Sequence, residues 1–189
     1  MWLLTEVSDR LSFDGYKKHT TAAYMAQRRS WAAILSGESL IGMHDPHPAS
    51  ALASVGDILF CSSILPWRSC SSRPPWVGGR HAVKTSATIS ELLRSLPAAQ
   101  LIWGGDWNHA LSGREFTGSQ EGRKHVLSAV AKLGLQVPTD TLPHRLPNLL
   151  TIDHIAVAQE SAVVEKFRIE ASAEGKRLSD HDAYVVEIR

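Results

Sequence analysis

The stretch LIWGGDWNHAL, from Leu101 to Leu111, joins an apolar run to a polar one. Three apolar residues lead into two glycines, and an aspartate and an asparagine follow. A short apolar run bounded by glycines is typical of a buried strand. Asp106 and Asn108 then lie two residues apart at the point where that strand ends. Both residue types also favour turns, so a purely structural turn is the alternative interpretation.

The composition indicates one globular domain over residues 1–189. The chain is 43% hydrophobic and 21% charged, which suits a folded domain with a real core. Its net charge of +1 does not require a nucleic-acid or membrane partner, although a local basic rim remains compatible with nucleic acid.

The chain shows no sign of a membrane or secretory segment. No run of about 18 apolar residues occurs, and the start MWLLTEVSDR lacks the features of a signal peptide. We therefore expect a cytoplasmic protein without a membrane partner, and the oligomeric state stays open. The two cysteines, Cys61 and Cys70, do not make a disulfide framework, and Cys61 is expected to be a buried thiol.

Hydrophobic patterns predict a mixture of strands and helices. Helical spacing extends from His81 to Leu96 and over residues 121–135, where Gly134 is a stop signal. The breaker-rich stretch RSCSSRPPWVGGR, residues 68–80, is expected to be a surface loop. The predicted strands are WLLTEV, WAAILS, SALASV, DILFCSSIL, LIWGG, TIDHIAV, VEKFRIE and AYVVEI. Strands early and helices between later strands predict a layered α/β domain.

Charged residues accompany three more of these apolar runs. Glu6 ends the first run, Asp153 and His154 lie inside TIDHIAV, and Asp180 and His181 precede the last strand. A charge in or beside a core strand costs several kcal/mol unless it is paired or binds a metal, so a shared cleft is predicted. Taken singly, Glu6 also fits a solvated strand end and SDHD a polar turn. His154 points to the face opposite Asp153 and is interpreted as a structural histidine.

The motifs TEV, GGDWN, IDHI and SDH, in this order, resemble those of the endonuclease/exonuclease/phosphatase superfamily, which has the DNase I-like fold. The resemblance covers nearly the whole chain, from Glu6 to the last predicted strand. It implies a four-layered α/β sandwich in which two β-sheets pack face to face and helices flank them. The four motifs together are far more specific than GDxN alone.

The resemblance also implies phosphoester hydrolysis with a divalent cation, Mg²⁺ or Mn²⁺, as cofactor. Magnesium prefers oxygen ligands. Glu6 matches the principal metal-binding glutamate of the family, and Asp180 matches a second acidic position near the metal.

Four further residues match catalytic positions of the family. Asp106 matches the carboxylate that orients and deprotonates the attacking water, and Asn108 matches an amide that contacts a phosphate oxygen or this water. We expect the two side chains to point the same way from an extended segment. His181 matches a histidine that contacts the scissile phosphate, and Asp153 matches the carboxylate that orients this histidine.

The sequence departs from the family in two places. Family members begin with a strand that carries an asparagine near the metal, whereas Glu6 stands close to the start here, so we expect a domain that is shortened at its N-terminus. Many members also have a histidine or tyrosine at the end of the central strand, where this chain has Ser63 or Ile64. Arg68 is a candidate for supplying positive charge to the substrate instead, and a surface arginine is the alternative.

The expected function is that of a metal-dependent phosphoesterase, with a nuclease-like phosphodiesterase preferred. A phosphomonoesterase, a lipid phosphodiesterase and a weakly active or inactive binding domain are the alternatives. Nucleic acid is a candidate substrate because several loop residues have the character of a basic, aromatic rim, with a solvated loop surface as the alternative. These residues are Arg73, Trp76, Arg80, Arg114, Phe116 and Arg123.

Overall fold

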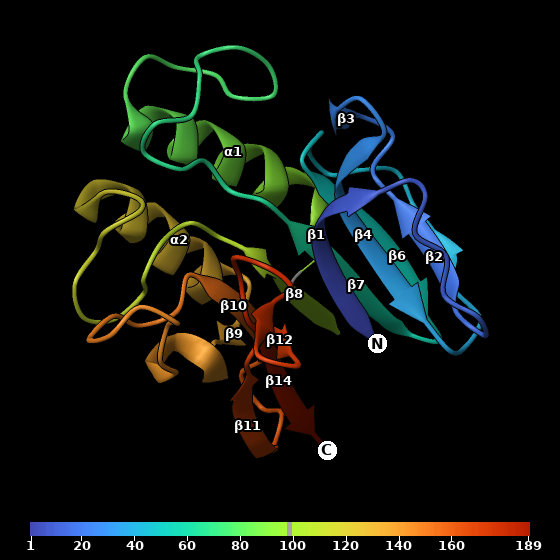
Figure 1. The fold of residues 1–189 in the computed structure, drawn as a ribbon. Coiled ribbons are helices and arrows are strands. Elements are labelled where there is room, and N and C mark those ends of the chain that lie inside the picture. Colours follow the sequence, from blue (N-terminus) through green and yellow to red (C-terminus); the bar gives the residue numbers. More distant parts are fainter. Residues whose placement is uncertain (98–99) are drawn as a thin grey trace.

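A six-stranded sheet forms the centre of the computed structural model, which describes residues 1–97 and 100–189 (Figure 1). In spatial order its strands are β5 (Ile41–Gly42), β6 (Ser50–Val55), β7 (Ile58–Ser63), β8 (Leu101–Asp106), β10 (Asp153–Ala158) and β9 (Leu135–Gln136). β7 and β8 are parallel and the other neighbours are antiparallel. The parallel pair needs a long crossover, which contains the helix α1 (His81–Ser95).

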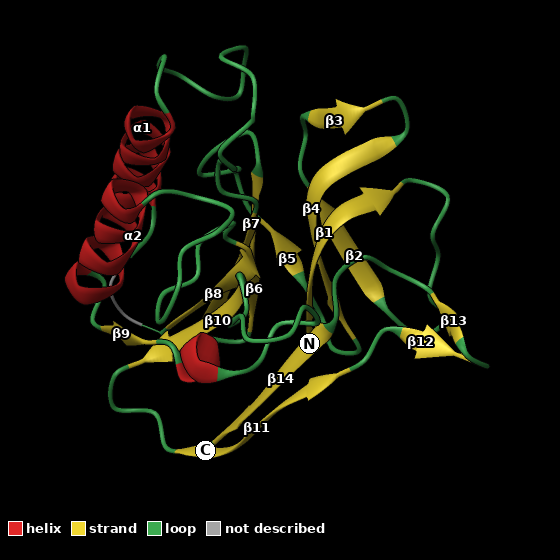
Figure 2. Ribbon diagram, turned by 60° about the vertical axis from the view of Figure 1, so that its left-hand side comes forward, coloured by secondary structure: helices red, strands yellow, loops and turns green. Residues whose placement is uncertain are grey.

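Two helices cover one face of this sheet, α1 and α2 (Gln120–Lys132), and a short 3₁₀ helix, η1 (Pro138–Thr141), lies near β10 (Figure 2). Ser119 caps α2 by accepting a hydrogen bond from the N–H of Gly122 at 3.1 Å. The apolar stripes of both helices and the sheet form the largest core cluster. The largest of its almost fully buried side chains are Leu65, Leu92, Leu101, Trp103, Trp107 and Val126.

A second antiparallel sheet packs against the other face of the central sheet (Figure 2). It consists of β1 (Trp2–Ser8), β4 (Arg29–Ser36), β2 (Lys17–Thr20) and β3 (Tyr24–Ala26). Ile34 of β4 packs with Ala51 of β6 and Phe60 of β7 between the two sheets. The α/β fold with two sheets face to face is therefore confirmed, although the described residues contribute long helices to one flank only.

The C-terminal part of the chain forms two small antiparallel sheets of two strands each. One pairs β11 (Val163–Ile169) with β14 (Ala183–Ile188), and the other pairs β12 (Ser172–Ala173) with β13 (Lys176–Arg177). Within the described ranges, β1 pairs only with β4, and β14 pairs only with β11. A cavity of about 390 Å³ lies between β1 and β14 and is lined by both.

The two glycines at the end of β8 are explained by close backbone packing. Gly105 has φ +124°, and a Cβ there would collide with the backbone of Ser63 on β7. A Cβ on Gly104 would lie 2.7 Å from the carbonyl oxygen of His154 and 2.9 Å from the side chain of Leu3. Because Gly104 and Gly105 have no side chains, β7, β10 and β1 can pack closely against the end of β8, next to Asp106.

Most of the predicted elements are present, and the main error concerns one loop. Residues 68–80 form no helix or strand, as expected, but Cys70 and Trp76 are buried instead of lying on the surface. Trp76 packs edge-on against Trp31, with ring centroids 5.4 Å apart, because this loop covers the end of the second sheet. The structure also contains short strands that were not predicted, among them β2, β3, β5, β9, β12 and β13.

The sequence predicted no disulfide framework and no membrane-spanning segment. Cys61 and Cys70 are both buried and free. Among the helices of residues 1–97 and 100–189, none has the length and apolar character needed to cross a membrane.

Candidate active site

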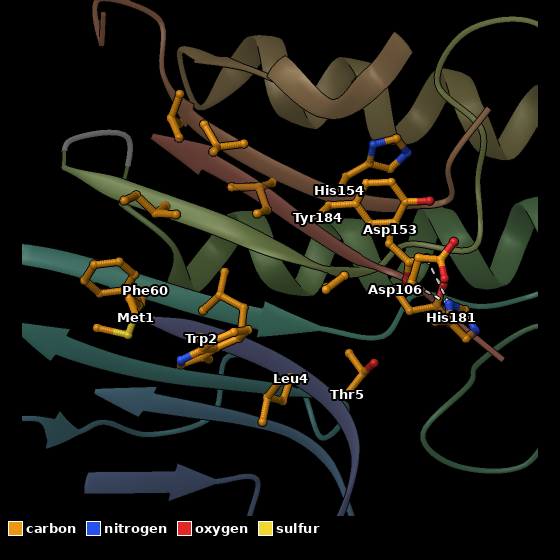
Figure 3. Close-up of a pocket in the computed structure, with 18 of the residues that line it drawn as sticks. Met1, Trp2, Leu4, Thr5, Phe60, Asp106, Asp153, His154, His181 and Tyr184 are labelled. Carbon is orange, nitrogen blue, oxygen red and sulfur yellow. Dashed lines mark hydrogen bonds and ion pairs between the residues drawn. The ribbon is translucent and has the colours of Figure 1, made fainter. Parts of the chain in front are cut away.

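Two carboxylates face each other where the central strands β8 and β10 end. Asp106 and Asp153 are direct partners in the antiparallel register of these strands. Side chains of directly opposed residues lie on the same face of a sheet, so both carboxylates point into the same cavity (Figure 3). The sequence prediction that these two residues meet is confirmed by this register.

The loop before β14 brings His181 to the same place. Its Nδ1–H donates to both carboxylate oxygens of Asp153, at 2.9 Å each, as Figure 3 shows. Asp106, Asp153 and His181 each offer a polar atom, and these atoms all lie within 4.8 Å of one another. The pairing of Asp153 with His181, which was implied only by the family resemblance, is therefore present.

The electrostatics of the cluster separate the roles of its members. Burial, followed by the charge of Asp153, raises the pKa of Asp106 to about 7. The hydrogen bond to Asp153 is the largest cause that raises the pKa of His181 to about 10. At neutral pH the cluster therefore combines a charged imidazolium with a carboxyl group that exchanges its proton readily.

Asn108 contacts Asp106 in a different way from the one predicted. The segment is not extended at this point, because Asn108 adopts a left-handed conformation with φ +53°. Its backbone N–H donates to Asp106 Oδ1 at 3.0 Å, and its Nδ2 donates to Asp106 Oδ2 at 2.9 Å. Asparagine tolerates this conformation better than most residues, and the turn folds its amide back onto the carboxylate. Nδ2 also donates to the carbonyl of Leu65 at 3.1 Å, so both amide hydrogens are used within the protein.

Glu6 lies apart from this cluster. It follows Thr5, which lines the cavity, but its carboxylate is half exposed and accepts a hydrogen bond from Arg29 Nη1 at 3.2 Å. Its backbone is left-handed, with φ +54°, an unusual conformation for a glutamate in a strand. The metal-binding role of Glu6 stays a prediction.

Asp180 is exposed beside His181, and its charge contributes to the raised pKa of that histidine. Among the residues that the structure describes, the one group of three potential metal ligands is Asp106, Asp153 and His181, without Glu6 or Asp180. Nδ1 of His181 is engaged with both carboxylate oxygens of Asp153, so these two members of the group are already paired within the protein.

The end of β7 provides no third polar group toward the cavity. Ser63 is fully buried, and its hydroxyl accepts a hydrogen bond from Trp103 Nε1 at 2.9 Å, while Ile64 belongs to the core. Arg68 donates from Nε and Nη2 to the carbonyl of Gly118, at 2.9 and 2.7 Å. These bonds tie two loops together, and a contact of Arg68 with substrate stays a prediction.

The basic, aromatic rim is only partly present. Trp76 is buried, as described above, and Arg123 is largely enclosed and lies 3.6 Å from Glu115. Burial removes both from a rim, because a binding surface needs exposed groups. Arg73, Arg80 and Arg114 are exposed.

Two buried polar residues complete the surroundings. His154 is buried, and its Nε2 pairs with the carbonyl of His109 at 2.9 Å, which confirms the structural interpretation. Asp182 was not predicted. Its buried carboxylate accepts from the N–H of Ala171 at 3.0 Å and from Arg177 Nη2 at 2.6 Å, and thereby anchors the loop that carries His181. The second aspartate of SDHD was the only sequence signal for it.

Comparison with known proteins identifies the fold. No protein-family model matches the chain, and no curated protein matches it in sequence. The endonuclease domain of TRAS1, a telomere-specific non-LTR retrotransposon, is 16% identical with a TM-score of 0.67, covering 99% of this chain and 84% of that one. AP endonuclease LMAP from Leishmania major is 15% identical with a TM-score of 0.60, covering 93% and 71%.

An endonuclease/exonuclease/phosphatase family protein from Leptotrichia buccalis C-1013-b is also similar, at 15% identity and a TM-score of 0.56, covering 94% of this chain and 73% of that one. Because the sequence identities are this low, these similarities establish the fold alone. The chain has the DNase I-like fold of the endonuclease/exonuclease/phosphatase structures, as its motifs predicted.

Proposed function

We propose that this protein is a metal-dependent phosphodiesterase with a nuclease-like substrate preference. The observation that carries the proposal is the cluster of Asp106, Asp153 and His181, assembled from three separate segments at one cavity. The similar structures include two endonucleases, which supports a nucleic-acid substrate over a small phosphomonoester.

Asp106 is the proposed general base. Its raised pKa lets it take a proton near neutral pH, which is the requirement for activating a water molecule. The two N–H groups of Asn108 fix the orientation of the carboxylate. The water would attack phosphorus in line with the leaving oxygen, and its proton would pass to Asp106.

His181 is the proposed cation that faces the phosphate. Negative charge grows on the phosphoryl oxygens during attack, and an imidazolium held in place stabilises it without reorganisation. Asp153 keeps His181 charged and oriented through its paired hydrogen bonds.

We further propose Mg²⁺ or Mn²⁺ as the cofactor, with Glu6 and Asp180 as its protein ligands. Such a cation would neutralise charge on the phosphate oxygens. The donors are of the right chemistry, since both are exposed carboxylates; Asp180 precedes His181 in the chain, and Glu6 follows Thr5, which lines the cavity. Glu6 would have to exchange its bond with Arg29 for the metal.

Hydrolysis assays test the proposal directly. Bis-p-nitrophenyl phosphate, p-nitrophenyl phosphate and plasmid DNA should be compared, each with magnesium, manganese or a chelator. We expect metal-dependent cleavage of the diester and of DNA, and loss of both in Asp106→Asn. Asp57→Asn is the matched control, because Asp57 is an exposed acid in the turn between β6 and β7. Faster hydrolysis of the monoester would indicate a phosphatase instead.

A second candidate is a binding domain with little or no activity. The position of Glu6 against Arg29, outside the cluster, is the observation that favours it. DNA binding without cleavage at any metal concentration would select this alternative. A cytoplasmic location stays part of the proposal.

A further inference from the structure

Asn108 holds a backbone conformation that its surroundings must enforce. A left-handed φ of +53° is uncommon for any residue other than glycine, and such conformations persist where neighbouring groups hold them. This conformation directs the backbone N–H and the side-chain amide of Asn108 at the two oxygens of Asp106. The groups that hold Asn108 therefore also control the orientation of Asp106.

Thr117 supplies one of these groups from a distant loop. Its hydroxyl donates to the carbonyl oxygen of Asn108 at 2.8 Å. On the other side, the carbonyl of Leu65 accepts from Asn108 Nδ2 at 3.1 Å. Asn108 is thus held between two loops, and the hydroxyl of Thr117 is the side-chain contact that fixes its carbonyl.

Thr117 is itself anchored by a buried acid. The side chain of Glu115 is 2% exposed, and its Oε1 accepts from the backbone N–H groups of Phe116, Thr117 and Gly118 at 3.0, 3.3 and 2.9 Å. Arg123 Nε lies 3.6 Å from the other oxygen, so this buried charge has a partner. A buried carboxylate with three N–H donors makes the turn rigid.

The turn that contains Thr117 and Gly118 packs closely against Asn108. A Cβ on Gly118 would lie 2.8 Å from the carbonyl oxygen of Asn108 and 2.7 Å from the ring of His109. Arg68 holds the same residue through two hydrogen bonds to the Gly118 carbonyl. Neither loop can therefore shift without moving Asn108.

We infer that Thr117 is a positioning residue that holds Asn108, and through it Asp106, with Glu115 as its anchor. The positioning of Asn108 follows from these contacts alone. The consequence for catalysis rests on the proposed function.

A spectroscopic experiment tests the positioning without any need for activity. The chain has only two asparagines, Asn108 and Asn148, so protein labelled with ¹⁵N-asparagine gives two pairs of side-chain amide signals. Asn148 is exposed and serves as an internal reference. We expect slow exchange of the Asn108 amide protons with water, and an exchange at least roughly tenfold faster in Thr117→Val.

Thr117→Ser keeps the hydroxyl and should restore slow exchange to within about twofold of the unchanged protein. Thr141→Val is the matched control at an exposed threonine, and it should change nothing. Where Thr117→Val lowers the melting temperature too far, Glu115→Gln tests the same support by weakening its anchor. Unchanged exchange at Asn108 in a folded Thr117→Val or Glu115→Gln protein would overturn the inference.

Kinetics then test the consequence for Asp106. Thr117→Val should lower kcat about tenfold with KM unchanged, the size expected for one lost hydrogen bond. In an Asp106→Asn background the same substitution should cause no further loss, because both act on one group. Independent losses would assign Thr117 a purely structural role. An inactive unchanged protein with a protected Asn108 would contradict the proposed function and leave the positioning supported.

Discussion

Asp106 and Glu6 are both acids on strands that border one cavity, and they differ in almost every other respect. Asp106 is buried, accepts two hydrogen bonds from Asn108 and lies opposite Asp153. Glu6 is half exposed, and its carboxylate pairs with Arg29. The sequence marked both as site residues, yet only Asp106 belongs to the observed cluster.

The difference follows from the position of each strand in its sheet. β8 lies between β7 and β10, so its last residue has neighbours on both sides that fix its side chain. β1 is an edge strand among the described residues, and its first residue, Trp2, is 47% exposed. The side chain at the end of an enclosed strand is therefore held in one orientation. An acid on an edge strand is exposed and can pair with another exposed side chain.

The largest effect on activity is expected from a change at Asp106, on the enclosed strand β8. Asp106→Ala should reduce phosphodiester hydrolysis by at least roughly a hundredfold with folding intact, since a general base typically contributes about 10²–10⁴-fold. Initial rates at saturating metal, with circular dichroism as a check of folding, measure this. Near-normal turnover would remove Asp106 from the mechanism.

The pair of Asp153 and His181 should behave as one unit. Either single alanine variant should slow hydrolysis strongly, and the double variant should be scarcely slower than the slower single one, because coupled residues are non-additive. A double-mutant cycle on kcat/KM gives the coupling. Losses that multiply would show that the observed hydrogen bonds have no catalytic role.

Adding a strand before β1 should raise the stability of the protein. In the family that the motifs resemble, a strand precedes the one that carries the glutamate, and here β1 and β14, which both line the cavity, each have one paired neighbour among the described residues. A version extended by an upstream strand, where the gene encodes one, should melt several degrees higher, since about 1 kcal/mol corresponds to 2–4 °C at this size. It should also gain more from magnesium. Thermal melts of both versions with and without several millimolar magnesium decide this, and equal melting with equal gain would make the strand dispensable.

The enclosed cluster should also make stability depend on pH in the metal-free protein. The folded pKa of His181 is raised from 6.5 to about 10, so its stabilisation is complete below pH 6.5 and is lost as pH rises toward 10. The folded pKa of Asp106 is raised from 3.8 to about 7, so its contribution also falls as pH rises through that range. Melting temperatures in chelator should therefore be lower at about pH 9.5 than at about pH 6.

Asp153→Asn is the control for this pH effect. Asp153 is the main cause of the raised pKa of His181 and a cause of that of Asp106, so the variant should lose much of the pH dependence. An unchanged pH dependence in Asp153→Asn would assign it to other groups.

The smallest effect concerns the exposed pair of Glu6 and Arg29. Exposed ion pairs contribute roughly 0.2–1 kcal/mol, so Arg29→Gln should lower the magnesium concentration for half-maximal activity by no more than about fivefold. Glu6→Gln should raise it. Magnesium titrations of both variants test this, and a matched substitution of exposed Arg28 is the control. A weaker response to magnesium in Arg29→Gln would show that the pair assists the metal site.

Local sequence patterns were enough to predict many of the helices and strands of this molecule. The apolar run at residues 101–103, the helical spacing from His81 and the glycine stop at Gly134 each depend on neighbours in the chain, and all appear in the structure. The order of TEV, GGDWN, IDHI and SDH was enough to predict the fold and the meeting of Asp106 with Asp153 and His181. These residues sit at strand ends, and strand order brings such ends together.

Tertiary structure alone decided the rest. Contacts between segments distant in sequence set the burial of Trp76, the enclosure of Arg123, the support of Asn108 by Thr117 and the partner of Glu6. Their positions are set by which strand edges are covered and which loops pack together, and a single sequence contains no local signal for either. The sequence by itself thus predicted the candidate groups, whereas tertiary packing brought only Asp106, Asp153 and His181 together in one cluster.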